Sequence, residues 1–398
     1  MKTILIGAGV AGLLYASMAE DLLILEKNEF AGRKLLATGN GRCNFTNLNL
    51  AGDFYHSSNR NFYKSAIKKY DNYDFIAYLN NLGVLTNHFE SGRCYPQSLS
   101  SKTIRDSLFL KASEKNTFIF NEEVVAIDFN KNVLRTKTKT YSFDKLIVAT
   151  GGMSLEGSGS DGKILKILGK YHKLTDISFA ITNYKAKNPL SKLAKGTRVK
   201  AGASLFVDGS LVKESYDDVI FQTYGLTGTA IFDLSNDISY ALLAGKDIKI
   251  KIDLLKEYES TKLIEILDKL VKAYPKREAY DLLKGFISDR LIKDILKRSV
   301  VEPKKWAMKL RERDLERIVS TLKGLIFDID DIYDRQNAQV TIGGIDTKYV
   351  DEVSFESKII KNLYFIGEIL DVDGACGGYN IQWAYSSAKS CLENMGDK

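Results

Sequence analysis

Short apolar runs and helical spacing alternate at the start of the chain. Thr3 to Ile6 and Leu22 to Leu25 are continuous apolar runs of strand length. Gly9 to Ala19, between them, has the length and apolar content of a short helix. The order strand, helix, strand predicts a β-α-β unit at the start of the fold.

The region that follows mixes helices and strands. Phe, Ile and Leu recur at helical spacing over residues 63–82, and a second helix is expected over 103–115. Strands are expected at 118–120, 124–129, 133–138 and 145–149, the last of which ends at Thr150-Gly151-Gly152. These elements extend the α/β pattern of the opening unit.

Two later changes of pattern divide the chain into parts. From about Leu174 to Ile252, short alternating segments and the turn Asp208-Gly209 predict an antiparallel β-rich insert. From Leu254 to about Phe327, Leu and Ile recur at helical spacing among charged residues, which predicts a helical unit. We therefore expect a discontinuous domain over 1–172 and 336–398, a β-rich insert domain over 173–253 and 328–335, and a helical insert subdomain over 254–327.

Bulk composition limits the class of protein. A chain of 398 residues with 44% hydrophobic and 27% charged residues is long enough for two or three globular domains. The net charge of +7 favours acidic partners, such as phosphate-bearing cofactors, nucleic acid or anionic lipid. A mild surplus of Lys with no partner explains the same number, and we prefer that explanation.

Cysteine and histidine are scattered along the chain. The four cysteines form no C-x-x-C pair and the three histidines do not cluster, so we expect neither a disulfide framework nor a metal site. Reduced thiols in a cytoplasmic protein follow as the default. No run of about eighteen apolar residues predicts a membrane span. A secretion signal ending at Ser17-Met18-Ala19 is rejected because the same stretch carries glycines at dinucleotide-binding spacing.

The first glycine-rich turn predicts a dinucleotide site. Gly7, Gly9 and Gly12 form a GxGxxG motif between two expected strands, where the backbone must approach a pyrophosphate closely. Glu26 ends the second strand nineteen residues after Gly7, close to the spacing of the acid that binds a ribose. The alternative, a glycine-rich turn without a ligand, does not explain that acid.

Two further blocks combine glycine with polar residues. The loop from Gly32 to Asn47 holds three glycines and three cations in an order too irregular for a helix, which suits an anionic cofactor. The block from Gly367 to Ala384 places acids and glycines after a strand and before a helix that begins near Tyr379. The dipole of that helix could stabilise negative charge on a flavin ring, which favours FAD over NAD.

These blocks resemble a known family. Residues 32–36, 41–47, 224–228, 340–344, 363–368 and 377–380 are similar to the motifs of the YhiN/BaiN-type NAD(P)/FAD-dependent oxidoreductases. Two positions depart from the family pattern: no Tyr-Pro pair follows Ser154, and Thr229 stands where the family usually has Pro. The loop after Thr150 is therefore expected to differ in shape.

The resemblance implies an α/β fold and a cofactor. The fold would be an FAD-binding Rossmann-like domain of three layers (ββα) built from both chain ends, with a β-rich insert and a small helical subdomain. FAD would be bound non-covalently. The residues that the resemblance and the motifs assign to the cofactor are Gly7, Gly9, Val10, Ala11, Gly12, Glu26, Lys27, Arg33, Lys34, Thr38, Gly39, Asn40, Gly41, Val125, Ala149, Thr150, Gly151, Gly367, Glu368, Asp373, Gly378, Tyr379, Asn380 and Ile381.

Finer assignments within this set also come from the resemblance. Glu26 would contact the adenosine ribose, Val125 the adenine and Asp373 the ribityl chain. Asn380 and Ile381 would lie at the flavin pyrimidine. Arg42, Cys43 and Tyr379 are the candidates for contact with substrate. For Cys43 and Cys376 we favour a role as small buried thiols, and for Tyr379 a packing role explains the residue equally well.

The sequence leaves two classes of function open. The first is an FAD-dependent oxidoreductase of a small organic substrate, re-oxidised by oxygen or another acceptor. NAD(P)H, if used, would be a transient reductant, because no second GxGxxG follows a strand. The second is a nucleic-acid-modifying or nucleic-acid-binding flavoprotein, with the cations of the helical insert tracking phosphate. A solvated helix face explains those cations as well, so we expect a small-molecule substrate and no nucleic-acid partner.

Overall fold

The computed structural model describes residues 2–396 and divides into two compact units. Unit 1 comprises Met1–Ala180 and Arg335–Lys398, and unit 2 comprises Ile181–Asp334. The barrel strands and the helices of residues 254–327 belong to the same unit. In the part of the chain that is described, no helix is long and apolar enough to cross a membrane.

A five-stranded parallel sheet forms the centre of unit 1. Its order is β20 (Leu363–Phe365), β11 (Lys145–Val148), β1 (Thr3–Ile6), β2 (Leu22–Leu25) and β7 (Thr117–Ile119). Because β20 lies beside β11, the two ends of the chain share one sheet. The strands β20, β11, β1 and β2 are mostly apolar and buried, as expected of a parallel sheet covered on both faces, whereas the edge strand β7 is half-buried to exposed.

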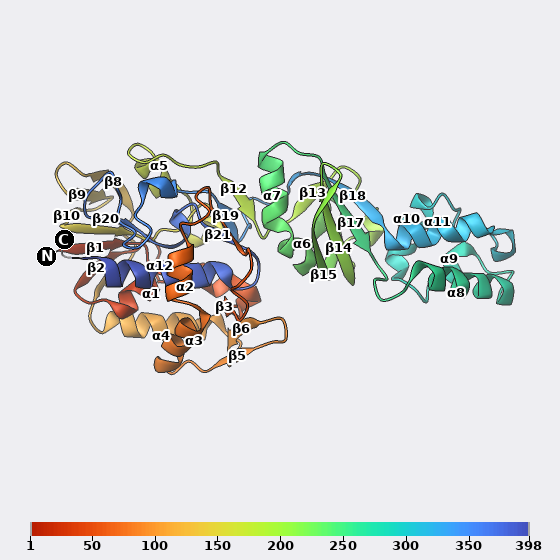
Figure 1. The fold of residues 1–398 in the computed structure, drawn as a ribbon, viewed down its shortest axis with the longest axis horizontal. Helices are drawn as coiled ribbons and strands as arrows, with labels where there is room; N and C mark the ends of the chain where they lie inside the picture. The colour runs from red at the N-terminus through yellow and green to blue at the C-terminus, as the bar shows by residue number, and fades with distance from the viewer. Residues whose placement is uncertain (1, 397–398) are drawn as a thin grey trace. The chain divides into compact units, whose positions relative to one another are not determined.

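Helices and a second sheet complete the layers of unit 1. The helices α1 (Val10–Met18), α4 (Ser101–Ser113) and α12 (Tyr379–Asn394) pack together, and Figure 1 shows α1 and α12 lying against the sheet. The strands β8 (Val124–Asp128), β9 (Val133–Thr136) and β10 (Thr140–Ser142) form an antiparallel sheet. The fold confirms the predicted Rossmann-like α/β class.

Smaller elements of unit 1 support the loops around the central sheet. They are β3 (Thr46–Asn47), β4 (Tyr55–His56), α2 (Lys64–Lys69), α3 (Asn72–Asn81), β5 (Thr86–His88), β6 (Arg93–Pro96), α5 (Lys163–Leu168), β12 (Ser178–Ala180), β19 (Val340–Ile342) and β21 (Asp373–Gly374). The continuous helical spacing expected over 63–82 is broken into α2 and α3. Asp71 causes the break, because its side chain accepts a hydrogen bond from Asp74 N and caps α3.

Unit 2 is built on a closed barrel. The strands in order are β13 (Tyr184–Ala186), β16 (Gly225–Thr227), β15 (Ser210–Gln222), β14 (Arg198–Val207), β17 (Ile248–Asp253) and β18 (Leu325–Ile332). The predicted antiparallel character is confirmed, but β14 and β15 form one long hairpin where short segments were expected. The helices α6 (Thr229–Asp233) and α7 (Ser235–Leu243) were not predicted, and α6 packs against β15.

The expected helical unit is present in unit 2. It consists of α8 (Ser260–Ala273), α9 (Ala279–Leu282), α10 (Asp289–Arg298) and α11 (Glu312–Lys323), which gather together in Figure 1. Leu263, Leu267, Ile292, Ile295 and Leu315 are among the buried residues of its core. The helical region ends at Lys323, because Leu325 to Phe327 already belong to β18.

Close approach of α1 to β1 and β11 requires glycine. A Cβ on Gly12 would lie 2.0 Å from the carbonyl oxygen of Gly7, and a Cβ on Gly7 would lie 2.8 Å from that of Ala149. Both carbonyls belong to backbone that cannot move without shifting a strand or its following turn. The helix therefore sits as near to the sheet as main-chain atoms allow.

We predict that Gly12→Ala destabilises the protein by about 3 kcal/mol or more, since the added methyl forces the helix away from the sheet. Urea denaturation followed by circular dichroism would measure the loss. Gly285→Ala is the matched control, because a Cβ there meets nothing within 4 Å. Equal stability of the two variants would contradict this account of the packing.

Candidate functional site

Gly9 differs from its two neighbouring motif glycines. A Cβ at Gly9 would have only the Ala149 carbonyl oxygen nearby, at 3.9 Å, so the protein itself does not require glycine there. No side chain caps α1, and its first turn carries no acid. Helix N–H groups and a partial positive charge thus face a surface with room for an anion. The residues fit the pyrophosphate of a dinucleotide cofactor.

Glu26 lies at the end of β2 and is 6% exposed. Its Oε2 accepts a hydrogen bond from Ala8 N at 2.7 Å, and its Oε1 accepts two from the backbone and side chain of Asn28. The carboxylate therefore ties the glycine-rich turn to the segment after β2. Only Oε2 keeps a lone pair for a further donor, and the ribose contact remains a prediction.

The loop after Lys34 has an unusual backbone. Gly39, Asn40, Gly41 and Cys43 all have positive φ, between 55° and 81°. Gly and Asn tolerate this region, whereas Cys43 is held there at a cost on the order of 1 kcal/mol. Thr38 closes the loop by accepting a hydrogen bond from Cys43 N through its carbonyl oxygen. The surrounding contacts hold the loop in this conformation, as in a binding loop that is formed before its ligand arrives.

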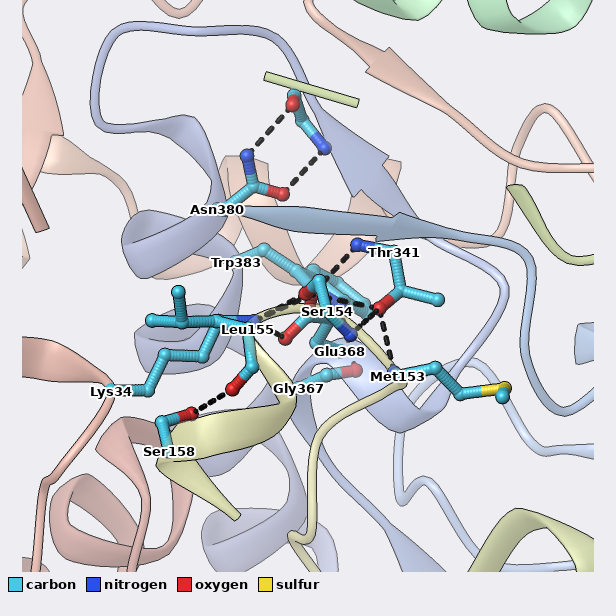
Figure 2. Close-up of polar contacts among 11 residues, drawn as sticks. Lys34, Met153, Ser154, Leu155, Ser158, Thr341, Gly367, Glu368, Asn380 and Trp383 are labelled. Atoms are coloured by element: carbon cyan, nitrogen blue, oxygen red, sulfur yellow. Dashed lines mark hydrogen bonds and ion pairs between the residues drawn. The ribbon is translucent and has the colours of Figure 1, made fainter. Parts of the chain in front are cut away.

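Lys34 and Glu368 form the centre of a polar network that joins distant parts of unit 1 (Figure 2). Lys34 Nζ lies 2.6 Å from Glu368 Oε2 and donates to Ser154 Oγ at 2.7 Å. Ser154 Oγ donates to Glu368 Oε1 at 2.9 Å, and Thr341 N donates to the same oxygen at 2.8 Å. Thr341 Oγ1 accepts from Met153 N and Ser154 N. Four segments of chain therefore meet at one carboxylate.

The helix α12 begins beside the strand β3. A Cβ on Gly378 would lie 2.5 Å from the Thr46 carbonyl oxygen, so α12 begins in close contact with β3. The side-chain amide of Asn380 donates to Gly374 O and accepts from Gly374 N, which holds the turn before the helix (Figure 2). The N–H groups of the first turn have no side-chain cap. They fit the flavin end of the cofactor.

The other predicted cofactor residues of unit 1 lie around these features. Lys27 pairs with Asp161 at 2.8 Å, and Arg33 lies 3.4 Å from Asn28 Oδ1. Val125 is 38% exposed at a register irregularity of β8, where it is available to a flat ligand. Asp373 is fully buried with His56 Nδ1 3.7 Å from its carboxylate. The remainder follow strand ends or flank the same helix starts: Val10, Ala11, Ala149, Thr150, Gly151, Gly367 and Ile381.

The three candidates for substrate contact occupy different environments. Arg42 is exposed. Cys43 is fully buried, and burial raises the pKa of its thiol to about 12, opposed by a hydrogen bond with Thr38. Tyr379 is 4% exposed, stacks on Phe54 with ring centroids 4.4 Å apart, and donates to Asn49 O. The geometry of Cys43 and Tyr379 is that of packing residues, and their contact with substrate stays a prediction.

Tyr95 was not identified from the sequence. It is half-buried on β6, and its ring lies near the glycine loop, 3.7 Å from the position of a Cβ on Gly39. Burial raises the pKa of its hydroxyl, while the charges of Arg93 and Arg42 oppose that rise. Its hydroxyl is thus protonated at neutral pH. Alternation within the four-residue strand 93–96 was the only signal available, and it does not separate a site residue from a packing one.

Metal-ligating side chains do not cluster among residues 2–396. No group of three or more His, Cys, Asp or Glu in that range could hold an ion.

The fold and the site together define an FAD-dependent oxidoreductase of the Rossmann type. The chain belongs to the family described as HI0933-like protein Rossmann domain, which matches residues 1–394. The predicted family resemblance is confirmed by that match.

Relatives match over nearly the whole chain, among them the following two. A 3-dehydro-bile acid delta(4,6)-reductase from Clostridium scindens is 29% identical over 96% of this chain and 96% of its own length. A ribosomal RNA dihydrouridine synthase from Escherichia coli is 29% identical over 98% of this chain and 97% of its own length. Among solved structures, a 3-ketosteroid-delta4-(5alpha)-dehydrogenase from Rhodococcus jostii RHA1 is 13% identical, with a TM-score of 0.45 and coverage of 98% and 96%. That likeness is too low to bear on function.

We predict that Gly9→Ala leaves the fold intact but abolishes retention of FAD, since the methyl enters the space left for the phosphates. Absorbance of the purified variant near the flavin bands, with circular dichroism as the control for folding, measures both effects. A yellow Gly9→Ala protein with wild-type flavin content would place the cofactor elsewhere.

We also predict that Glu368→Ala lowers stability by about 3 kcal/mol, because it leaves Lys34, Ser154 and Thr341 N without their common partner. Urea denaturation of the apoprotein measures the loss without any contribution from a ligand. The exposed pair of Glu20 with Lys115 provides the control, and Glu20→Ala should leave the denaturation midpoint unchanged. A midpoint for Glu368→Ala equal to that of Glu20→Ala would show that the network contributes little.

Proposed function

We propose that this protein reduces a carbon–carbon double bond conjugated to a carbonyl group, with non-covalent FAD as the cofactor and NAD(P)H as the reductant. The observation that carries the proposal is the chemistry shared by the names of its two relatives. A 3-dehydro delta(4,6) steroid is a dienone, and dihydrouridine forms when the double bond of uracil beside a carbonyl is saturated. The two carriers differ, but the bond that is reduced is of the same kind.

The cofactor residues fit this chemistry. Reduced FAD, when bound, would supply a hydride to the carbon atom that is β to the carbonyl. Glu26 and the start of α1 would hold the ribose and pyrophosphate, and the uncapped start of α12 would stabilise negative charge at the ring. The loop at residues 38–43 would pass beside the cofactor in its preformed conformation.

Reduction of a conjugated double bond also requires a proton at the carbon atom α to the carbonyl. Tyr95 is the candidate donor, because its hydroxyl is protonated at neutral pH and its ring lies at the glycine loop. Overall, substrate, NAD(P)H and one proton give the saturated product and NAD(P)⁺. The positive charge of Arg42 near Tyr95 would stabilise the hydroxyl oxygen after it releases its proton.

The test is anaerobic mixing of the purified yellow protein with NADH or NADPH, followed by addition of an enone or a uracil-containing substrate. Bleaching of the flavin by the pyridine nucleotide and its return with either conjugated substrate are the expected results. Bleaching by an amine or alcohol instead, with peroxide release in air, would identify an oxidase and contradict the proposal.

We predict that Tyr95→Phe lowers the rate of substrate reduction by about a hundredfold, the usual effect of removing a general acid. The rate of flavin bleaching by NAD(P)H and the FAD content should stay at wild-type values, because neither step uses the proton. The exposed Tyr73 provides the control variant Tyr73→Phe. An equal loss in both half-reactions would show that Tyr95 supports the fold rather than proton transfer.

A further inference from the structure

Positive charge is concentrated in the helical region of unit 2. Residues 254–327 contain eighteen Lys and Arg against twelve Asp and Glu, a net +6 out of +7 for the whole chain. The rest of the chain is therefore nearly neutral. A general surplus of Lys would be spread evenly, so the alternative preferred from composition does not account for this distribution.

A basic hollow lies within this region, between the short helical turn Ala307–Lys309 and the start of α11. It has a volume of about 740 Å³. Five of its eight lining residues are cations, and one is acidic. The lining comprises Lys305, Met308, Lys309, Leu310, Arg311, Arg313, Asp314 and Arg317.

The single acid holds two of the cations in place, and the lining of the hollow keeps a positive net charge. Asp314 is 4% exposed, lies 2.7 Å from Lys305 Nζ, and contacts Arg317 at 2.5 Å. Burial alone would raise its pKa, but hydrogen bonds from Arg311 N, Lys305 and Arg317 outweigh burial and hold the pKa of this carboxyl below its usual value. Asp314 is thus ionised at neutral pH and fixes two cations in the wall.

The other three cations that line the hollow are not paired with acids in the described part of the chain. Lys309, Arg311 and Arg313 are exposed, and no ion pair between their side chains and a carboxylate occurs in the described part of the chain. Elsewhere in unit 2, exposed cations such as Lys246 and Lys284 are paired with nearby acids. Three guanidinium and ammonium groups at one hollow therefore present charge that the protein does not itself neutralise.

Aromatic and apolar side chains border the same cations. Trp306, directly after Lys305, is 43% exposed, and Met308 is 60% exposed. The backbone of this segment bonds to the 275–277 segment through Ala307 N and Met308 N. There the guanidinium of Arg277 lies 3.7 Å above the ring of Tyr274, which is 42% exposed. Cations interleaved with exposed rings are the surface that single-stranded nucleic acid requires, since rings stack on bases and cations hold phosphates.

We propose that this hollow and its aromatic border bind single-stranded RNA, with phosphates at Lys309, Arg311 and Arg313 and a base on Trp306. RNA is favoured over an anionic lipid surface because the cations line a concave hollow, whereas a membrane contacts a flat or convex face. Uracil contains a conjugated double bond of the kind that the proposed reaction reduces. The inference that RNA carries the substrate base therefore rests on the proposed function. The binding surface itself does not depend on that reaction.

The experiment measures binding of the full-length yellow protein to a fluorescein-labelled oligouridine of about twenty nucleotides, a length that spans one or more such sites. The expected result for wild type is binding that weakens linearly in a plot of log affinity against log salt. The triple variant Lys309→Glu, Arg311→Glu, Arg313→Glu should bind at least about tenfold more weakly, with a salt slope reduced by about two. Trp306→Ala should weaken binding by a similar factor without changing the slope.

A charge-matched control on the same unit is Lys187→Glu, Lys192→Glu, Lys195→Glu, three exposed lysines that border the barrel. This variant should bind RNA within about twofold of wild type, because it leaves the hollow intact. FAD content and bleaching by NADPH should be unchanged in every variant, which shows that unit 1 is intact, and an unchanged circular dichroism spectrum shows that unit 2 is folded.

Four results of the binding measurements would overturn the proposal. They are absence of RNA binding by wild type, equal losses in the two triple variants, equal binding of oligodeoxythymidine and oligouridine, and preferred binding to vesicles of phosphatidylcholine with phosphatidylglycerol. A higher KM for NADPH in the hollow variant with unchanged RNA binding would likewise assign the cations to the reductant. If RNA binds as expected but no uracil or enone is reduced, the proposed reaction is wrong and the binding surface stands.

Discussion

The contact between the first turn of α1 and the carbonyl of Gly7 is the constraint on which unit 1 depends. Because a single methyl at Gly12 would lie 2.0 Å from that oxygen, the helix axis and the strand direction are fixed relative to each other. The uncapped N–H groups of α1 consequently point to a defined place at the ends of β1 and β11. Gly367 repeats the arrangement from the other end of the chain, since a Cβ there would meet Ala11 at 2.7 Å. Binding geometry and core packing are thus set by the same atoms.

Charge is used in two distinct ways in the two units. In unit 1, the Lys34–Glu368 pair is about one-fifth exposed and is surrounded by hydroxyl and N–H donors, so removal of either partner leaves groups unsatisfied. Its role is to hold segments together. In unit 2, the cations at the start of α11 face solvent with few acidic partners. Such groups contribute little to folding and are available to an outside ligand.

Much of unit 1 could be predicted because its signals are local. The strands at 3–6 and 22–25 and the start of α12 at Tyr379 match the structure to the residue, since apolar runs and glycine punctuation mark them. The helix over 63–82 was wrongly expected to be continuous, because capping by Asp71 competes with spacing. Tyr95 and the meeting of Ser154 and Thr341 at Glu368 could not be found from the sequence, since they arise from residues up to 214 positions apart.

The chain leaves unit 1 after β12 and returns before β19, and these two strands pair with Ala180 opposite Val340. The exit and entry points of the insert are therefore neighbours in a small hairpin-like ladder that closes without it. Replacement of residues 181–339 by a short turn would preserve that ladder and every strand of the parallel sheet. The insert is consequently free to diverge, exchange or acquire new surfaces during evolution while the redox scaffold stays the same.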